Sequence, residues 1–565
     1  MSKRPPITIL YNGKIVTVDE AFSMAEAVAI SEGKFIRVGR SDEVRALTDS
    51  DTEEIDLKGK MVVPGFIDTH PHVIHRGIGR ATMLPLMGLP SIGAIKKRIN
   101  EGAERIPKDQ WIVTTPVGNP PDYFHLPESL EDKRWPTRWD LDEAAPDRPV
   151  YISAPLVWAP HPAIFNSHAL NLLGISRSTQ SEEKGAIIVK DPKTGEPNGQ
   201  VHRMHFWNYG SIFWNLMAML PKPSFEQIIS GLKMGIKDFN TSGVTTGYEG
   251  HVTTADHFVL CRELWSRNEL DMRIYFAYEL DKNKSLSEIE EWMGNLAHAT
   301  GRGFGDDRLR ICGITASIDG PSQLGVSVMN KPYLDPYGNE TKGVQQIEAD
   351  KLKEICLLAA KHNIRMNVQV GGDKATDIAL EAYEEVNRKI SIKNRRWILQ
   401  HIQHPSLENI EQCRELQVAV TTVSNFEYSK GEETYVNRLG GDYCERAIPF
   451  RRWLDAGVLV SQSTDGAHYE PMFTIWNSLK RIDGRTGKSL MTVEKQITRE
   501  EAIRLYTING AKVLFWEDKL GSIEEGKLAD LVVLENDILT CPLDEIKDTR
   551  VLMTMVEGKV VYEAE

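Results

Sequence analysis

The chain has 565 residues, of which 41% are apolar and 26% are charged, with no compositionally biased tract. This composition is ordinary for a soluble globular protein, and the length exceeds what one compact core usually supports, so two or three structural units are expected. The formal net charge of −13 argues against nonspecific binding to nucleic acid or to anionic membranes.

The cysteines and the first residues indicate the compartment. Six cysteines are scattered without a C-x-x-C pair, which predicts reduced thiols and not a disulfide framework or a zinc knuckle. The first six residues run directly into a strand-like segment, which leaves no room for the apolar region of a signal peptide. No apolar run approaches the roughly 20 residues needed to span a bilayer. We therefore expect a cytoplasmic protein with no nucleic-acid or membrane partner.

Both ends of the chain are rich in predicted strands. Short strand-like runs separated by Asn-Gly and Glu-Gly turns occupy residues 7–58, and strand-like runs return at 531–534, 551–556 and 559–562. Two strand-rich ends around an α/β middle predict that the termini pair into one small β-sandwich domain. We place this domain at residues 1–60 and 515–565.

The middle of the chain alternates strand-like runs with amphipathic helical ones, which is typical of a parallel sheet. There are eight such strand-like runs, at 61–68, 243–249, 272–278, 309–318, 365–370, 397–402, 418–424 and 458–465. Eight strands close a (β/α)8 barrel, so we predict an α/β fold with a TIM-type barrel over residues 61–514.

The stretch at about 74–240 is too long for one connection between a strand and the next. It predicts an inserted lid subdomain over the mouth of the barrel. The Trp- and Phe-rich segment at 205–214 suggests an apolar wall for substrate, although packing beneath the insertion is an equal alternative.

Two histidines one residue apart end the first barrel strand. Residues i and i+2 of a strand point to the same side, so His70 and His72 project together from its C-terminal end. Paired neutral imidazoles suit a divalent metal. The alternative for an isolated pair is two hydrogen-bonded loop residues.

The segment 64–72, Pro-Gly-Phe-Ile-Asp-Thr-His-Pro-His, resembles the first-strand signature of the amidohydrolase superfamily. Further segments resemble its third family, which includes hydrolases of the N-substituted formamide deformylase type. These segments lie in the expected order at 158–161, 165–170, 243–246, 318–320, 463–466 and 521–530.

The resemblance implies a metal site at the C-terminal ends of the barrel strands. The implied ligands are His70 and His72 after strand one, His401 after strand six and Asp465 after strand eight. Glu249, after strand two, is a further candidate ligand or base, and His251 is a less favoured one. The implied cofactor is one divalent ion, with zinc expected first and Mn, Fe or Co as alternatives. Asp465 would also take a proton from the attacking water.

Two departures from the pattern of binuclear relatives disfavour a second metal. Thr315 occupies the strand-four position where those relatives carry a carboxylated lysine, and threonine supplies no bridging carboxylate. Gln369 occupies the strand-five position of a histidine, and a neutral amide is a far poorer ligand for a transition metal than imidazole.

The remaining residues implied by the resemblance would bind substrate or stabilise charge. His161 or Gln369 would assist the metal in stabilising the oxyanion. The candidate substrate-binding residues, each with a structural role as its alternative, are Trp158, Asn166, Asp319, Tyr428 and Arg446.

These features together predict a metal-dependent amidohydrolase that cleaves a C–N bond of an amide, formamide or cyclic amide, with a homo-oligomer expected from the resemblance. A non-hydrolytic lyase, hydratase or decarboxylase on the same scaffold stays open, because altered ligands accompany altered chemistry. A degenerate barrel that acts as a binding protein or inactive subunit is the third possibility.

Overall fold

The computed structural model describes residues 6–155, 158–207, 210–296, 300–466, 468–490 and 496–565. Of the aromatic segment at 205–214, residues 208–209 lie outside this described part. Within the described residues, no helix combines the length and the apolar character needed to cross a membrane.

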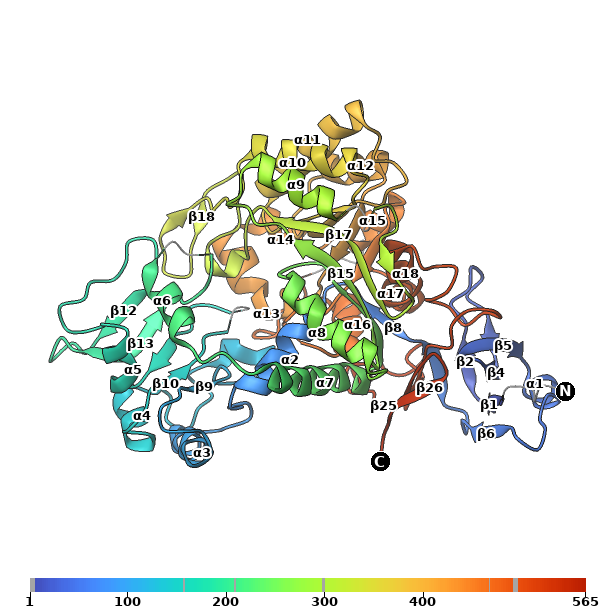
Figure 1. Cartoon of the computed structure of the whole chain (residues 1–565), viewed down its shortest axis with the longest axis horizontal. Coiled ribbons are helices and arrows are strands. Elements are labelled where there is room, and N and C mark those ends of the chain that lie inside the picture. Colours follow the sequence, from blue (N-terminus) through green and yellow to red (C-terminus); the bar gives the residue numbers. More distant parts are fainter. Residues whose placement is uncertain (1–5, 156–157, 208–209, 297–299, 467, 491–495) are drawn as a thin grey trace.

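Eight parallel strands form the central barrel (Figure 1). They are β8 (Phe66–Asp68), β14 (Val244–Glu249), β15 (Arg273–Glu279), β17 (Leu309–Ser317), β20 (Met366–Val370), β21 (Ile398–His401), β22 (Ala419–Thr422) and β23 (Val460–Gln462). Neighbours in this order pair in parallel from β8 to β23. The two ends of the sheet meet where the hydroxyls of Thr69 and Ser461 lie 2.8 Å apart. The (β/α)8 prediction is confirmed.

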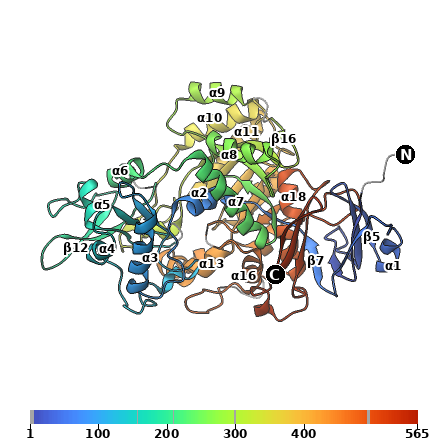
Figure 2. The same ribbon diagram turned by 60° about the horizontal axis from the view of Figure 1, so that its bottom comes forward.

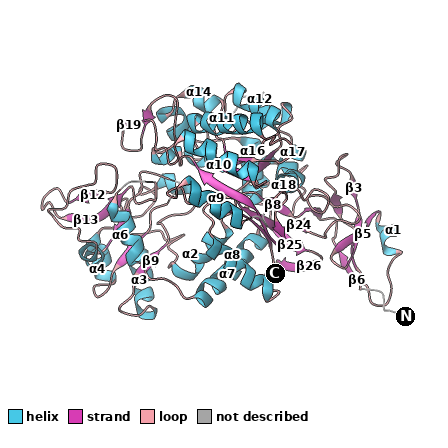
Figure 3. Cartoon of the chain, turned by 45° about the horizontal axis from the view of Figure 1, so that its top comes forward, coloured by secondary structure: helices cyan, strands magenta, loops and turns pink. Residues whose placement is uncertain are grey.

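Helices surround the barrel (Figure 3), and apolar stripes on the longer ones pack against the strands. In α11, for example, Ala375, Ala379 and Ala382 are fully buried on one face. The helices of this layer are α2 (Val73–Thr82), α7 (Phe225–Thr241), α8 (Ala255–Ser266), α9 (Leu286–Asn295), α10 (Ala349–Lys361), α11 (Asp373–Lys389), α12 (Leu407–Leu416), α13 (Asn425–Lys430), α14 (Gly441–Glu445), α15 (Phe450–Asp455), α16 (Pro471–Lys480), α17 (Arg499–Tyr506) and α18 (Ile508–Leu514).

Strands from both ends of the chain form two further sheets, which lie together on one side of the barrel in Figures 1 and 2. The six-stranded sheet has the order β26-β25-β24-β7-β2-β3 and the four-stranded sheet the order β5-β4-β1-β6. A shared apolar core that includes Leu10, Val28, Val62 and Leu531 joins them. The strands are β1 (Thr8–Tyr11), β2 (Lys14–Val16), β3 (Met24–Ala25), β4 (Ala27–Ser31), β5 (Lys34–Gly39), β6 (Glu53–Asp56), β7 (Met61–Pro64), β24 (Leu531–Leu534), β25 (Val551–Val556) and β26 (Lys559–Glu563).

The segment between β8 and β14 carries a sheet of its own, on the opposite side of the barrel from the terminal sheets (Figure 2). Its strand order is β12-β13-β11-β10-β9, and helices α3 (Ile92–Arg105), α4 (Arg138–Ala144), α5 (Ser167–Leu172) and α6 (Ser211–Met219) pack around it. The strands are β9 (Ile112–Thr114), β10 (Val150–Ile152), β11 (Ala163–Phe165), β12 (Ile187–Lys190) and β13 (Pro197–His202).

The predicted first barrel strand, 61–68, is in fact two strands in two different sheets. β7 pairs with β2 and β24 of the terminal sheet, whereas β8 pairs with β14 of the barrel. Gly65 lies at the change of partner, and its N–H donates to the carbonyl of Asp530 at 2.9 Å. Periodicity could not show this break, because both halves are buried.

Replacing Gly65 with alanine is expected to destabilise the protein by about 1–3 kcal/mol, because a Cβ there would lie 2.3 Å from the Thr245 hydroxyl. The shift of the urea unfolding midpoint measures the effect. Gly294→Ala in α9 is the matched control. No atom lies within 4 Å of its Cβ position, so a slight gain in helix stability is expected. Equal midpoints for the two variants would contradict the close approach at Gly65.

Candidate metal centre

Three of the four implied ligands converge at the C-terminal end of the barrel. His70 follows β8, His401 ends β21 and Asp465 follows β23. One ligand atom from each lies within 4.8 Å of the other two. A backbone hydrogen bond joins two of these three strand ends, because the N–H of Asp465 donates to the carbonyl of His70 at 3.0 Å.

Three residues of this region have a left-handed backbone conformation. His72, His401 and Asp465 have φ values of 56°, 69° and 55°, in the left-handed region that non-glycine residues rarely occupy. Buried Asp68 supports the turn, because its carboxylate accepts the N–H groups of His70 at 3.0 Å and of Thr464 at 3.2 Å. Strain held by surrounding hydrogen bonds is typical of a functional site.

Burial and neighbouring charges set the protonation of the cluster. Burial lowers the pKa of His70 well below its usual range and that of His401 to about 4, so both imidazoles are neutral and able to bind a metal. Burial alone would raise the pKa of Asp465. The hydrogen bond from His72 outweighs burial and holds that pKa well below its usual range. Asp465 is therefore an ionised carboxylate beside neutral nitrogen ligands.

The His72 side chain lies between Asp465 and a second group of potential metal ligands. Its Nε2 lies 3.4 Å from Oδ1 of Asp465, and this carboxylate raises the pKa of His72 although burial opposes the shift. His72 also forms a second group with His75 of α2 and Glu249 of β14, in which one ligand atom from each lies within 4.8 Å of the other two. Burial raises the pKa of Glu249 to about 7.

The unpaired polar atoms in this region fit a bound cation. Both ring nitrogens of His70, Nδ1 of His401 and Oε2 of Glu249 are buried without a hydrogen-bond partner. Buried polar atoms without partners are costly, and a divalent ion satisfies imidazole and carboxylate groups directly. The residues present therefore suit a divalent cation.

The two departures from the binuclear pattern lie near the C-terminal ends of their strands. The Thr315 hydroxyl in β17 and Oε1 of Gln369 in β20 are buried and lack hydrogen-bond partners. β17 and β20 are adjacent, and Ser317 lies beside Gln369 in their register. Both positions thus border the strand ends without offering imidazole or carboxylate.

His251 lies closer to the cluster than its sequence position indicated. Its ring stacks near that of His70, with centroids 5.9 Å apart. Its Nδ1 lies 3.2 Å from Oε2 of Glu279, at the end of β15, and 3.1 Å from the hydroxyl of Ser317, at the end of β17. A histidine oriented in this way by a carboxylate resembles the supported histidines of metal and acid–base sites.

Lys430 is a further residue of this region that sequence reasoning missed. The side chain is fully buried, its Nζ has no hydrogen-bond partner, and it lies 3.5 Å from the centroid of the Phe426 ring. The Phe426 ring lies 5.6 Å from that of His401. Burial lowers the pKa of Lys430 to about 7. Lys430 ends α13 and leads into a π-helix at Gly431–Arg438, an element frequent at functional sites.

The assignment of Asn166 to substrate binding is wrong. Its side chain is fully buried and caps α5, accepting the N–H groups of Val150 and Ala169 at 3.0 Å each. The amide also donates to the carbonyls of Ala145 at 3.1 Å and Arg148 at 2.9 Å. All its hydrogen-bonding capacity goes to the backbone, so the role is structural.

Asp319 is also corrected, because it holds the loop after β20, whereas a substrate role for Arg446 stays a prediction. Buried Asp319 accepts the N–H groups of Gly371 at 2.6 Å and Gly372 at 2.9 Å. Arg446 donates to Asp373, the first residue of α11, at 2.9 Å. The contacts of Asp319 engage both of its oxygens, so its carboxylate is not free to bind substrate.

His161 and Trp158 lie in the insertion, and His161 is in neither group of potential metal ligands. They line a cavity of about 20 Å³, room for about one water molecule, together with Arg203, His205 and Tyr337. The His161 ring packs 4.7 Å from that of Trp135, and burial lowers its pKa to about 3. The structure does not bring His161 into the ligand cluster.

Tyr428 connects the barrel to the insertion. Its hydroxyl lies 3.2 Å from Oδ1 of Asp122, and its ring packs against Phe124 of the insertion at 5.9 Å. Phe124 in turn packs 5.7 Å from Trp158. A substrate role for Tyr428 and Trp158 stays a prediction.

Comparisons with known proteins agree on one family. The sequence model of the amidohydrolase family matches residues 53–562. The N-substituted formamide deformylase of Arthrobacter pascens is 28% identical over 565 residues, a match that covers 98% of each chain. The putative amidohydrolase YtcJ of Bacillus subtilis is 26% identical over 563 residues, covering 98% of this chain and 99% of that protein.

Solved structures show the same fold. An uncharacterized metal-dependent hydrolase from Pyrococcus furiosus has a TM-score of 0.71 at 24% identity, covering 94% of this chain and 100% of that chain. At this identity the similarity concerns the fold alone.

Proposed function

The chain belongs to the amidohydrolase family, and from this premise we propose that it is a metal-dependent hydrolase of a carbon–nitrogen bond in a small molecule. The observation that carries the proposal is the convergence of His70, His401 and ionised Asp465 on one point at the barrel mouth. Formamides, other amides and cyclic amides are the proposed substrates, since one relative is named for N-substituted formamides.

Two imidazoles and one carboxylate are ligands that zinc prefers, with Mn, Fe or Co as alternatives. When bound, such an ion supplies a Lewis acid and lowers the pKa of a water molecule towards neutrality. Asp465 is ionised and therefore able to accept a proton from the attacking water and return it to the departing amine.

Two side chains are available to stabilise the negative charge that develops on the substrate oxygen. Lys430 carries a buried amino group close to the Phe426 ring, which lies 5.6 Å from the ring of His401. Gln369 offers a buried side-chain amide beside the strand that ends in His401. Donors in a water-poor site act more strongly than in bulk water.

The test is amine release from a panel of N-substituted formamides, acyl amides and cyclic amides. We expect release from at least one class, loss of that activity after treatment with a chelator, and recovery on addition of Zn²⁺. Formate or another carboxylate should appear in equal amount, because water adds across the broken bond.

Other results would favour other functions. Turnover of a non-amide substrate without amine release would favour a lyase, hydratase or decarboxylase. A protein that binds no metal and turns over no substrate of the panel would favour a binding protein or an inactive subunit.

A further inference from the structure

A buried lysine side chain lies in the connection after the seventh barrel strand. Lys430 ends α13 and is fully buried, and within the described part of the chain its Nζ has no hydrogen-bond partner. Burying a cation without a partner costs free energy, and the ring of Phe426 at 3.5 Å compensates only in part. The amino group is therefore suited to an anion that comes from outside the chain.

The Phe426 ring connects Lys430 to the candidate metal cluster. Nζ lies 3.5 Å from the centroid of this ring, and that centroid lies 5.6 Å from the centroid of the His401 ring. Nζ is thus no farther from the His401 ring than these two distances taken together. Burial lowers the pKa of Lys430 to about 7, although the charge of Asp465 opposes this shift. A substrate bound at the cluster can therefore reach Lys430 with a second group.

A second buried cation lies in the same irregular helix. Arg438 ends the π-helix that follows Lys430, and its Nε has no hydrogen-bond partner among the residues described. The carboxylate of Glu433 lies 4.0 Å from that nitrogen. After burial, the charge of Arg438 is a further cause of the lowered pKa of Lys430, because like charges repel. An anion near both side chains would relieve this repulsion.

Two buried contacts fix α13 on α16 and so hold Lys430 in place. Glu427 of α13 forms a buried ion pair with Arg481, the residue that follows α16. The side-chain amide of Asn425 donates to the hydroxyl of Thr474 in α16 at 2.9 Å. A binding group that is positioned before the ligand arrives loses less conformational entropy on binding.

We propose that Lys430 binds a carboxylate group of the substrate, so that the protein hydrolyses formamides whose amine part carries a carboxylate in preference to neutral formamides. This inference rests on the proposed function and names its substrate class. An ammonium group donates charge-assisted hydrogen bonds to a carboxylate, and a water-poor surrounding strengthens them. Gln369 is then the side chain that remains for the oxyanion.

The test compares formamides with and without a carboxylate in the wild type and in Lys430→Met. N-formylglycine, N-formyl-β-alanine and N-formyl-γ-aminobutyrate place the carboxylate at increasing distance, and N-isobutylformamide carries an alkyl group of similar shape instead. We expect the wild type to prefer one of the three carboxylates. For that compound, Lys430→Met should lower kcat/KM by roughly 10–100-fold, mainly through KM, the range for a lost hydrogen bond to a charged group. For N-isobutylformamide, kcat/KM should change by less than about threefold.

Lys488→Met is the matched control, because Lys488 pairs with Glu432 of the same π-helix and its side chain is 65% exposed. This variant should keep wild-type kinetics on every compound. Methionine keeps the apolar stem of Lys430 and removes the buried amino group, so Lys430→Met should be at least as stable as the wild type in thermal unfolding.

Three results would overturn the carboxylate site and leave the proposed function standing. The first is an equal loss of kcat on all four compounds, which would assign Lys430 to the oxyanion. The others are unchanged kinetics in Lys430→Met and a wild type that prefers N-isobutylformamide.

A wild type that hydrolyses none of the four compounds would count against the proposed function. Titration calorimetry with the three carboxylates then decides the inference separately. Binding to the wild type that Lys430→Met abolishes would support the carboxylate site. Absent binding, or equal binding by both proteins, would overturn it.

Discussion

Asp465→Asn is expected to lower kcat/KM by roughly 10²–10⁴-fold, the range that loss of a positioned general base produces. Asparagine keeps the size and an oxygen of the side chain but cannot accept a proton from water. The loss should appear in kcat even when metal is supplied in excess, because the proton transfer is removed whether or not the ion binds.

The other members of the two ligand groups are not expected to replace Asp465 as the base. His70 and His401 are neutral, and both are occupied as nitrogen ligands when a cation is present. The Glu249 carboxylate belongs to the second group, and burial raises its pKa to about 7. Asp465 is therefore the ionised carboxylate of the first cluster.

Steady-state kinetics on an amide that the wild type hydrolyses measure the effect, with metal content determined on the same samples. Asp455→Asn is the control, because Asp455 pairs with Arg451 and its side chain is 65% exposed. Asp455→Asn should retain wild-type kcat/KM. If Asp465→Asn retains kcat within a factor of about three at full metal occupancy, Asp465 is not the base.

The sequence predicted those parts of the molecule that depend on local pattern. All eight barrel strands appear as apolar runs, since parallel strands are covered on both faces. The limits of the first run were wrong, because Met61–Pro64 and Phe66–Asp68 are equally buried and only the change of partner sheet at Gly65 divides them.

In the site, too, residues with a local sequence motif could be predicted, whereas residues that depend on tertiary packing could not. His70, His72, His401 and Asp465 carried local motifs at strand ends, and the structure gathers them. His75 becomes recognisable only once α2 is known to begin at Val73, which places His75 within its first turn, beside His72. Lys430 has no sequence signal, because its burial results from the packing of α13 and the π-helix after it.

Several family-like residues proved structural for a related reason. A motif marks a position that a family retains, but it does not distinguish a residue that touches substrate from one that holds a loop. The Asn166 side chain is hydrogen-bonded to backbone N–H groups and carbonyls, and the Asp319 carboxylate accepts backbone N–H groups. Only the folded structure brings these partners together. The segment 521–530 is a comparable case, since its last residue, Asp530, joins the barrel to the terminal sheets.

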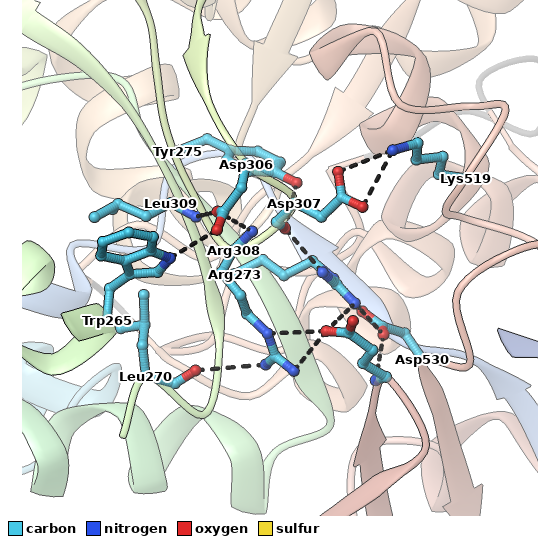
Figure 4. Close-up of polar contacts among 11 residues, drawn as sticks. Trp265, Leu270, Arg273, Tyr275, Asp306, Asp307, Arg308, Leu309, Lys519 and Asp530 are labelled. Carbon is cyan, nitrogen blue, oxygen red and sulfur yellow. Dashed lines mark hydrogen bonds and ion pairs between the residues drawn. The ribbon is translucent and has the colours of Figure 1, made fainter. Parts of the chain in front are cut away.

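Asp530→Asn is expected to cost roughly 3–5 kcal/mol of stability, the range for removing one partner of a buried ion pair. Arg273 of β15 and Asp530 form two parallel hydrogen bonds of 2.9 Å each (Figure 4), with side chains that are 0% and 4% exposed. Burial opposes the charge of Arg273, but Asp530 overcomes that effect and raises the pKa of the guanidinium. Without Asp530, this buried cation would lack its close partner.

The same region supplies a matched comparison. Lys519 pairs with Asp307 at 2.9 Å, but both side chains are partly exposed, at 47% and 34% (Figure 4). Lys519→Met should therefore cost less than about 1 kcal/mol. The combined replacement Arg273→Met and Asp530→Leu should recover most of the loss of Asp530→Asn, because no unpaired buried charge is left.

Urea unfolding midpoints of the four proteins measure these differences, with tryptophan fluorescence and circular dichroism as parallel probes. Glu557 is the other carboxylate near Arg273 and could replace Asp530 as its partner. Its Oε2 lies 3.6 Å from Nη2 of Arg273 and 2.8 Å from Nη2 of Arg308. A loss below about 1 kcal/mol in Asp530→Asn would mean that Glu557 turns to Arg273 as a substitute partner. In that case Glu557→Gln added to Asp530→Asn should restore the large loss, since Arg273 would then lack any carboxylate within reach.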